Sequence, residues 1–419
     1  MDNKSNLISK RRTFKDGWAF ILYLMYTIGC SGCLVMFGME TDASLTNVNY
    51  KLLAVLSIST LAVIILSFLL FAFLCEFTIK FSAILFPVIQ IAMLCFFPTN
   101  VVVIVLGVLS ILSWASFVYL YWSQIPIIAK VLTYTTRICL SHLFTCVFGI
   151  VICNAIQIFQ VFLAFLVLPK LDDKNSIFML AAVFLNLFWT LANFSCFFKV
   201  YISSVVAFHF VNSGSGVFGD TMYNTLCALG SISFAGLVIA SVQTVRLLVD
   251  RARREDREEQ NLFTKIMLCI LVIFLTLLQD IIEFANEFSM PYIAIHGCGY
   301  KESVRESFKL ITRINTIALS GVTLLNIALS QFSILMMTIT FGLSYYTIGA
   351  NLKFDFQDKL FLNSLINTII GVLVVYFTTM STFISSYLGL IYLNAERPNL
   401  VSEVDPRISD TLKKTTASN

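Results

Sequence analysis

The pattern that dominates the chain is a series of long apolar runs separated by short polar segments. A helix that crosses a bilayer needs about 20 mostly apolar residues. Runs of this length predict spans near Trp18–Gly38, Leu52–Cys75, Ser82–Phe97, Val101–Tyr121, Leu143–Leu168, Leu226–Val249 and Leu262–Leu278. Three further runs are long enough for one tilted helix or two crossings, namely Ile177–Val211, Ile314–Ile348 and Phe361–Leu393. The pattern therefore predicts an all-α, polytopic transmembrane helical bundle of about 10–12 spans.

Two segments have the period of amphipathic helices. Residues 125–141 carry Lys130 and Arg137 among apolar residues, which predicts an interfacial helix. Residues 301–311 place Val304, Phe308 and Ile311 on one face, which predicts a short amphipathic helix. The chain thus divides into an N-terminal tail (1–17), a transmembrane domain (18–393) and a polar C-terminal tail (394–419).

Positive charge before the first span and in one loop between later spans bears on the orientation in the membrane. Basic residues before the first span favour a cytoplasmic N-terminus, and the length of that span indicates a retained anchor. These residues are Lys4, Lys10, Arg11, Arg12 and Lys15. The Arg-rich loop 250–261 is also expected in the cytoplasm. Both expectations hold only if Ile177–Val211 crosses twice or a neighbouring segment is re-entrant.

Composition supports the membrane assignment and excludes several classes of protein. Hydrophobic residues make up 58% of the 419 positions and charged residues only 12%, whereas soluble domains have about 25% charged residues. The net charge of +4 forms no basic stripe, so no nucleic-acid partner is expected. The three histidines lie too far apart along the chain for a local metal motif, and the Cys30-x-x-Cys33 pair lies in an apolar run that favours packing. No catalytic constellation, P-loop or cofactor motif is present, so an enzyme is not predicted.

Two segments carry more than hydropathy. The first comprises Leu185-Asn186-Leu187-Phe188-Trp189-Thr190 and the later helix Leu229-Gly230-Ser231-Ile232-Ser233-Phe234-Ala235-Gly236-Leu237-Val238-Ile239-Ala240. The second is Asn286-Glu287-Phe288-Ser289-Met290-Pro291-Tyr292-Ile293-Ala294-Ile295-His296-Gly297, followed by Tyr300. In order and spacing they resemble the choline transporter-like family, especially its compact fungal branch, the pH-nine-sensitive proteins.

The resemblance covers residues 184–376 in detail and shows two kinds of departure. Only Met39–Lys51 stands where the animal branch has a large extracellular domain, and the late cysteine- and acid-containing motif of the family is absent near Thr382–Ala395. In the second segment the alanine and tyrosine of the family fall on Ser289 and Met290, and Tyr292 comes two places later. The resemblance implies a transporter fold and a choline-like substrate.

Candidate substrate-binding residues follow from the chemistry of such a substrate. A quaternary ammonium donates no strong hydrogen bond, so its recognition relies on aromatic faces. Phe188 and Trp189 are candidates because they belong to the family-like segment, and Tyr292 is a candidate because it lies beside a matched position. Aromatic residues are common in this chain, and each of the three is otherwise explained as core or lipid-facing.

Two acids stand at the end of an apolar run. Asp280 and Glu283 lie three residues apart on one helix face and are candidates for proton or cation coupling if they face the protein interior. If the helix has reached the headgroups there, they are ordinary surface acids. Gln243 and Arg246 at the end of the preceding span are their expected partners. Residues 286–291 are expected to break the helix, either as part of a gate or as an ordinary turn.

The sequence therefore predicts a membrane transporter for choline or a related amino alcohol such as ethanolamine. Transport would proceed by alternating access, driven by the electrochemical gradient and open to proton coupling. The expected partners are a small organic cation and the lipid bilayer. The expected location is the plasma membrane, with an endomembrane as the alternative. A non-transporting receptor or a lipid-handling scaffold is the second hypothesis.

Overall fold

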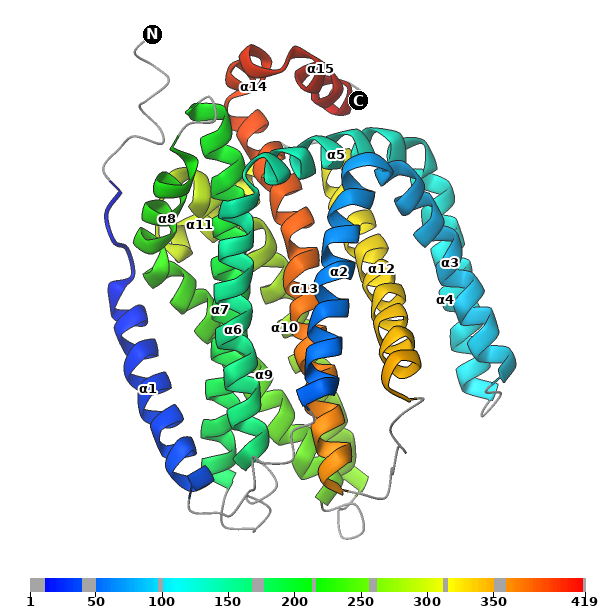
Figure 1. Cartoon of the computed structure of the whole chain (residues 1–419), viewed down its shortest axis with the longest axis vertical. Helices are drawn as coiled ribbons and strands as arrows, with labels where there is room; N and C mark the ends of the chain where they lie inside the picture. The colour runs from blue at the N-terminus through cyan, green and yellow to red at the C-terminus, as the bar shows by residue number, and fades with distance from the viewer. Residues whose placement is uncertain are drawn as a thin grey trace.

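The computed structural model describes residues 12–39, 50–96, 101–167, 177–212, 216–255, 262–311, 316–349 and 359–416, and every regular element in them is helical, as predicted. Figure 1 shows the arrangement. The elements are α1 (Gly17–Met39), α2 (Tyr50–Phe73), α3 (Cys75–Phe96), α4 (Val101–Tyr121), the 3-10 turn η2 (Trp122–Gln124), α5 (Ile125–Ser141), α6 (Leu143–Val167), α7 (Ile177–Val211), α8 (Val217–Cys227), α9 (Leu229–Glu255), α10 (Leu262–His296), α11 (Tyr300–Ile311), α12 (Thr316–Gly349), α13 (Lys359–Glu396), α14 (Pro398–Val404) and α15 (Pro406–Thr416).

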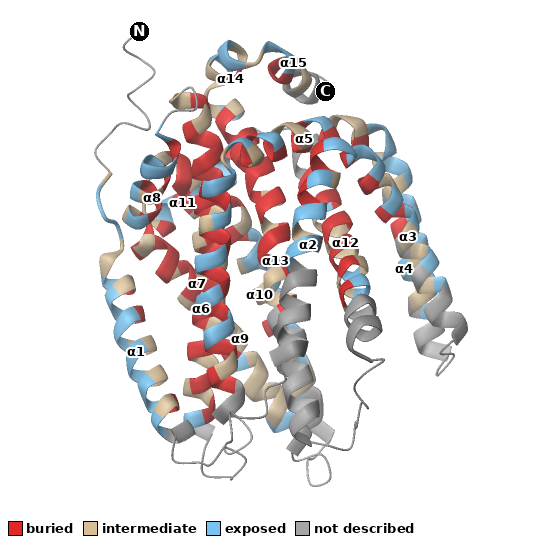
Figure 2. Cartoon of the chain, in the orientation of Figure 1, coloured by how far each residue is buried: buried red, intermediate tan, exposed pale blue. Residues whose placement is uncertain are grey.

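Helix α7 lies at the centre of the bundle. It packs against α6, α9, α10 and α13, and its upper half in Figure 2 is buried around most of its circumference. Phe198, Tyr201 and Val205 are all 0% exposed. A helix that is apolar on all sides requires burial on all sides, so the sequence of α7 fits this central place.

The helices form two groups that share α13. In the α7 group, α1, α6, α9 and α10 pack around α7. In the α12 group, α2 and α3 pack with α12, and α5 packs with α2 and α3. Helix α13 packs against α7 and α6 on one side and against α12, α5 and α2 on the other. The contact between the two groups therefore runs mainly through α13.

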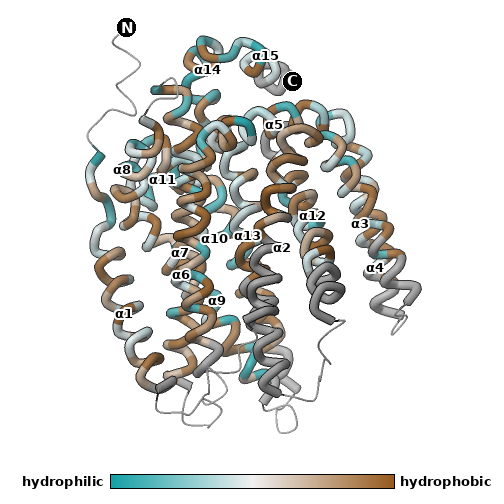
Figure 3. The backbone as a smooth tube through the Cα atoms, viewed as in Figure 1, coloured by the Kyte–Doolittle hydropathy of each residue, from teal (hydrophilic) through white to brown (hydrophobic). Residues whose placement is uncertain are grey.

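The outer helices expose large apolar side chains. On α1, Met25 is 73% exposed and Met36 71%, and at the start of α7 Phe178 is 89% exposed. Figure 3 shows hydrophobic colour along the length of the bundle, with hydrophilic colour on α5, α14 and α15 at one end. A continuous exposed apolar surface of this kind is unfavourable in water and indicates contact with lipid.

Eight helices of the described chain are long and apolar enough to cross a membrane, and nine spans result if the bent pair of α2 and α3 counts as one. The described parts of these two helices meet at a bend of 110°. With 24 and 22 residues, α2 and α3 are each long enough to cross about 30 Å of hydrocarbon, which would bring the number to ten, the lower limit of the prediction.

Two of the predicted interruptions are absent from the structure. Ile177–Val211 is one continuous helix of 35 residues, so the hypothesis that it crosses twice is wrong. Pro291 lies inside α10, which continues to His296, so the predicted break at residues 286–291 is wrong as well. A proline removes one backbone hydrogen bond, and the close packing of this part of α10 holds the helix together around it.

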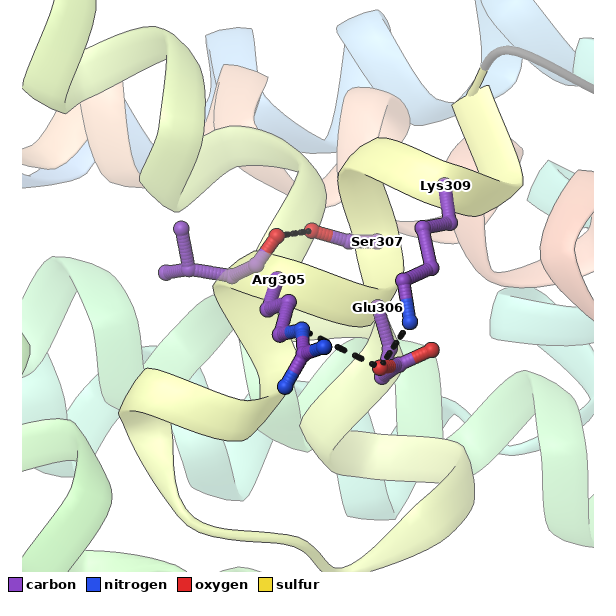
Figure 4. Close-up of polar contacts among 5 residues, drawn as sticks. Arg305, Glu306, Ser307 and Lys309 are labelled. Atoms are coloured by element: carbon purple, nitrogen blue, oxygen red, sulfur yellow. Dashed lines mark hydrogen bonds and ion pairs between the residues drawn. The ribbon is translucent and has the colours of Figure 1, made fainter.

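Helices α5, α14 and α15 lie at one end of the bundle, and residues 12–16 before α1 lie in the same half; we call this end the N-terminal face (Figure 1). Helices α8 and α11, both short, lie on the same half of the molecule. Helix α11 exposes a charged side on which Arg305 and Lys309 approach Glu306, at 3.9 and 2.7 Å (Figure 4). The helices that do not cross the bundle thus gather toward one face.

The segment before α1 is fastened to this half of the molecule. The Arg12 guanidinium donates to the carbonyls of Ala294 (3.1 Å) and Ile295 (3.0 Å) at the end of α10, and also to the Asn224 side chain. The Asp16 carboxylate accepts hydrogen bonds at 2.9 Å from the Ser231 hydroxyl and from the Tyr300 backbone N–H. Two charged residues thus join the segment to α8, α9, α10 and α11.

The Arg-rich end of α9 lies at the opposite face. Helix α9 begins beside Asp16, and its 27 residues extend for about 40 Å, so Arg251 and Arg253 lie on the other side of the bundle. Gly230 permits this start, because a Cβ there would collide with the backbone of Lys15 and Asp16. Residues 12–16 and the end of α9 therefore cannot both face the cytoplasm in this arrangement.

Candidate functional site

Polar side chains are buried between α6, α7 and α13. On α6 they follow one face at spacings of three residues, and one residue each on α7 and α13 completes the set, where packing against a neighbouring helix excludes lipid. We call this set the polar seam: Asn154, Gln157, Gln160, Asn186 and Thr378, each less than 9% exposed. Buried amides are costly unless they form hydrogen bonds, so their partners matter.

Several bonds link the seam across helices. Asn186 Nδ2 donates to Gln160 Oε1 at 3.1 Å, and Gln160 Nε2 donates to the Ser31 hydroxyl of α1 at 2.9 Å. The Thr378 hydroxyl of α13 donates to Gln157 Oε1 at 3.2 Å. The seam therefore connects α1, α6, α7 and α13 in the interior of the bundle.

Part of the seam is left without a protein partner. Both side-chain polar atoms of Asn154 and the Oδ1 atom of Asn186 are buried and accept or donate no hydrogen bond within the described chain. The hydroxyls of Ser381 and Thr382, one turn beyond Thr378 on α13, are in the same condition. Buried polar atoms in native proteins normally have partners, so these positions are suited to contact water or a polar solute.

Trp189 is enclosed by other side chains. It is 1% exposed, its indole N–H donates to the Ser233 carbonyl at 3.0 Å, and its ring lies 5.4 Å from Tyr23 and 5.8 Å from Tyr26. Phe188 is half-buried and stacks on Phe184 at 5.8 Å. In this conformation the two residues join α7 to α1 and α9.

Tyr292 lies in a separate cluster toward the N-terminal face. Its ring stacks on the His296 ring at 4.2 Å and meets the Tyr392 ring of α13 at 6.5 Å. His296 Nε2 lies 3.8 Å from a carboxylate oxygen of Glu396. The Tyr392 hydroxyl is buried and lacks a hydrogen-bond partner among the described residues. We call Tyr292, His296, Tyr392 and Glu396 the tyrosine cluster, which combines aromatic faces with a carboxylate.

The seam and the tyrosine cluster lie along the same helix. On α13, Tyr392 follows Thr378 by 14 residues, which is about 21 Å of helix. Between them Thr382 and Ser385 are also buried, at 1% and 2% exposure. Buried polar groups thus continue along α13 from the seam toward the N-terminal face.

The two predicted acids are at the surface of the protein. Asp280 and Glu283 are both exposed, and Glu283 accepts hydrogen bonds from Gln279 at 2.7 Å and from Gln243 at 3.4 Å. The expected pairing of Gln243 with these acids is therefore present, whereas Arg246 donates to Gln279 instead, at 2.9 Å. The structure does not bring the acids together with Trp189 or with Tyr292.

Glu287, one turn beyond Glu283, is the acid that the site prediction missed. It is half-buried and accepts a hydrogen bond at 2.8 Å from the Asn326 side chain. Because Asn326 lies on α12, this bond joins the α7 group to the α12 group. The sequence signal was a carboxylate and an amide in apolar runs, but nothing in the sequence pairs them.

Two of the histidines meet between helices. His142 and His209 are 67 residues apart in sequence, yet His142 Nε2 lies 3.0 Å from His209 Nδ1. In the described chain, no three His, Cys, Asp or Glu residues come together in a manner that could hold a metal ion. The pair therefore joins the α5–α6 junction to α7 as a hydrogen bond between rings.

Comparison with known proteins places these helices in a family. The plasma-membrane choline transporter family matches residues 104–392, more than half of the chain. Choline transporter-like 2 of Drosophila melanogaster is 31% identical over 126 residues, which is 29% of this chain and 16% of that protein. Choline transporter-like protein 2 of Danio rerio is 31% identical over 96 residues, which is 22% of this chain and 14% of that protein. Protein PNS1 of Mycosarcoma maydis is 23% identical over 169 residues, which is 36% of this chain and 32% of that protein.

The matched segments are thus less than a third of the length of each of these relatives. The family match is broader, since it extends from α4 to α13 and includes the polar seam and Tyr292. The resemblance inferred from residues 184–376 lies within it. The chain is therefore a multi-pass membrane protein that belongs to the plasma-membrane choline transporter family.

Proposed function

We propose that this protein transports choline or a related amino alcohol such as ethanolamine across a membrane. The observation that carries the proposal is the family match over residues 104–392, which includes the polar seam between α6, α7 and α13. Buried polar atoms without partners offer a solute contacts that an apolar core would not. The match to Protein PNS1 also leads us to place the chain in the compact fungal-type branch.

The tyrosine cluster is our preferred site for the cation. Tyr292 is half-buried and stands beside Tyr392 and the Glu396 carboxylate, so a quaternary ammonium could meet aromatic faces and a negative charge together. Phe188 and Trp189 remain proposed substrate contacts. Because Trp189 is enclosed by α1 and α9, it would reach the solute only after these helices move apart.

Alternating access requires contacts between moving parts to break and re-form. We propose that the α7 group and the α12 group are these parts, with α13 between them. The Glu287–Asn326 hydrogen bond joins the two groups and would open during the cycle. For proton or cation coupling we retain Asp280 and Glu283 and add Glu287, because it is half-buried and its carboxylate bonds to Asn326 of the other group.

The orientation that we propose places the N-terminal face in the cytoplasm. Among the described residues, the helices and segments at that face carry many cations, whereas α9 ends at the opposite face with Arg251 and Arg253. The cations toward the N-terminal face include Arg12, Lys15, Lys130, Arg137, Lys301, Arg305, Lys309, Arg397 and Arg407. Excess Lys and Arg favours the cytoplasmic side.

The test is flux into liposomes. The purified protein is reconstituted, and uptake of labelled choline is measured with and without an inside-negative potential set by a potassium gradient. A permanent cation gains about 2.3 kcal/mol per 100 mV. At an inside-negative potential of about 100 mV, the ratio of choline inside to choline outside should therefore rise toward roughly fiftyfold. Empty liposomes and unlabelled choline as competitor are the controls.

Two outcomes would contradict the proposal. Absence of saturable uptake would remove the transport function, and binding without counterflow would support a receptor instead.

To locate coupling, an imposed proton gradient is applied to Asp280→Asn, Glu283→Gln and Glu287→Gln. We expect the last of these to lose the largest part of any proton-dependent uptake.

A further inference from the structure

A cavity of about 810 Å³ lies at the N-terminal face, between the bend that joins α2 to α3, helix α5 and helix α15. It includes neither the polar seam nor the tyrosine cluster. Its lining is partly apolar and partly charged, and the charged residues are Glu76, Lys80, Lys130, Arg137, Asp405 and Arg407. Four cations thus stand against two carboxylates.

Both carboxylates are already engaged. Glu76 pairs with Lys80 at 2.6 Å. One oxygen of Asp405 accepts hydrogen bonds from the backbone N–H groups of Arg407 at 2.9 Å and Ile408 at 3.4 Å, and so caps the start of α15. Within the described chain, no carboxylate lies in ion-pair distance of Lys130, Arg137 or the Arg407 side chain. The cavity therefore has an uncompensated positive charge.

Arg137 is held in a position that suits an oxyanion. Its Nε–H donates to the Ala72 carbonyl near the end of α2 at 3.4 Å, and its guanidinium lies 5.9 Å from the Phe73 ring. The contacts found in the described residues use Nε and the face of the guanidinium, so the two terminal nitrogens can bind a further acceptor. A guanidinium presents such donors in a fork that matches a phosphate.

The rim of the cavity is apolar. Phe73 is 70% exposed, Leu74 52% and Phe77 64%, and Lys80 lies 5.7 Å from the ring of Trp122. Large exposed apolar side chains beside a Trp and cations are typical of the boundary between acyl chains and headgroups. A phosphate free in solution gains nothing from such a rim, whereas the acyl chains of a lipid would cover it.

We propose that this cavity binds the phosphate headgroup of an anionic phospholipid. Lys130, Arg137 and Arg407 would contact the phosphate oxygens, and Phe73 and Phe77 would contact the acyl chains. The volume lies in the range of known ligand sites. The choice of an anionic lipid rests on the proposed orientation, because the cytoplasmic leaflet carries the anionic lipids.

The experiment measures lipid binding by the full chain in mixed micelles by native mass spectrometry. The probes are phosphatidylserine and phosphatidylinositol 4,5-bisphosphate, with phosphatidylcholine as the zwitterionic comparison. The test variant is Lys130→Gln/Arg137→Gln/Arg407→Gln. The control is Lys301→Gln/Arg305→Gln/Lys309→Gln, which removes three cations from α11 in the same half of the molecule. We expect the test variant to bind the anionic lipids roughly 100-fold more weakly, or about 3 kcal/mol at about 1 kcal/mol per cation, and the control to bind as the unmodified protein does.

A second variant guards against a structural effect, because Arg137 also bonds to Ala72. Lys130→Gln/Arg407→Gln retains that bond and should still lose roughly 30-fold in affinity. Equal losses in the test and control variants would overturn the proposal, since they would show diffuse attraction to the face. Competition by soluble inositol 1,4,5-trisphosphate at the affinity of the lipid would overturn the lipid assignment in favour of a dissolved phosphate. The measurement needs no flux, so its failure is distinct from failure of the transport proposal.

Discussion

Arg12→Ala tests whether the segment before α1 holds the ends of the helices at the N-terminal face together. The guanidinium donates to the carbonyls of Ala294 and Ile295, which lie in the last turn of α10 and have no further helical partner. Within the described chain, this charged side chain donates hydrogen bonds both to Asn224 of α8 and to the end of α10. Its removal leaves the two carbonyls and Asn224 without that donor.

The magnitude follows from the contacts and from the cost of burial. Hydrogen bonds to a charged donor contribute about 1.5–3 kcal/mol each, so two give roughly 3–6 kcal/mol. Burial opposes this gain, and it lowers the pKa of Arg12 to about 10. At neutral pH the group stays protonated, because that pKa lies well above 7. The expected net loss in the free energy of unfolding is about 2–3 kcal/mol.

The assay is thermal unfolding of the purified protein in detergent. At about 2 °C per kcal/mol for a large chain, the midpoint should fall by roughly 4–6 °C. Lys15→Ala is the matched control, since it removes one cation from an exposed side chain of the same segment. Midpoints that agree for the two variants would refute the inference that Arg12 fastens the segment through its charge-assisted bonds.

Three further predictions concern the aromatic and acidic residues of the bundle. Tyr292→Ala should raise the KM for choline by roughly 2- to 30-fold, the equivalent of one cation–π contact of about 0.5–2 kcal/mol. The control Tyr223→Ala, on the exposed side of α8, should leave the KM unchanged. Equal KM values for the two variants would exclude Tyr292 from the substrate site. Glu287→Gln keeps an acceptor for Asn326 and should retain choline counterflow while the response to a proton gradient falls, and a normal response would dissociate this acid from coupling. Trp189→Ala should lower the free energy of unfolding by about 3–5 kcal/mol, because it leaves a cavity between α1, α7 and α9. The control is Trp122→Ala, since Trp122 is 40% exposed. A loss for Trp189→Ala no greater than that of the control would contradict the burial of this ring.

The acidic residues show where inference from sequence reached its limit. Hydropathy located Asp280 and Glu283 at the end of an apolar run, yet both are exposed, and the half-buried acid is Glu287. The three lie on similar faces of one helix, so their burial depends on how far along α10 the neighbouring helices cover it. That coverage is set by packing between helices and cannot be computed from the local pattern.

The histidines show the same limit at longer range. Nothing in the spacing along the chain indicates a contact between His142 and His209, but the packing of α6 against α7 places the Nε2 atom of His142 3.0 Å from the Nδ1 atom of His209. Sequence separation measures distance only within one element. Contacts between elements depend on the order in which the helices pack.

The sequence by itself determined the class of the protein and most helix boundaries. Val101–Tyr121 and Ile125–Ser141 are helices with the limits that the sequence pattern predicts, because the cost of exposing backbone and polar groups to lipid is local and sums along each segment. Tertiary structure alone decided that α7 continues unbroken, that Trp189 is enclosed, and that the polar seam faces inward. Those properties depend on which helix faces which, and that depends on side-chain packing among segments far apart in the chain.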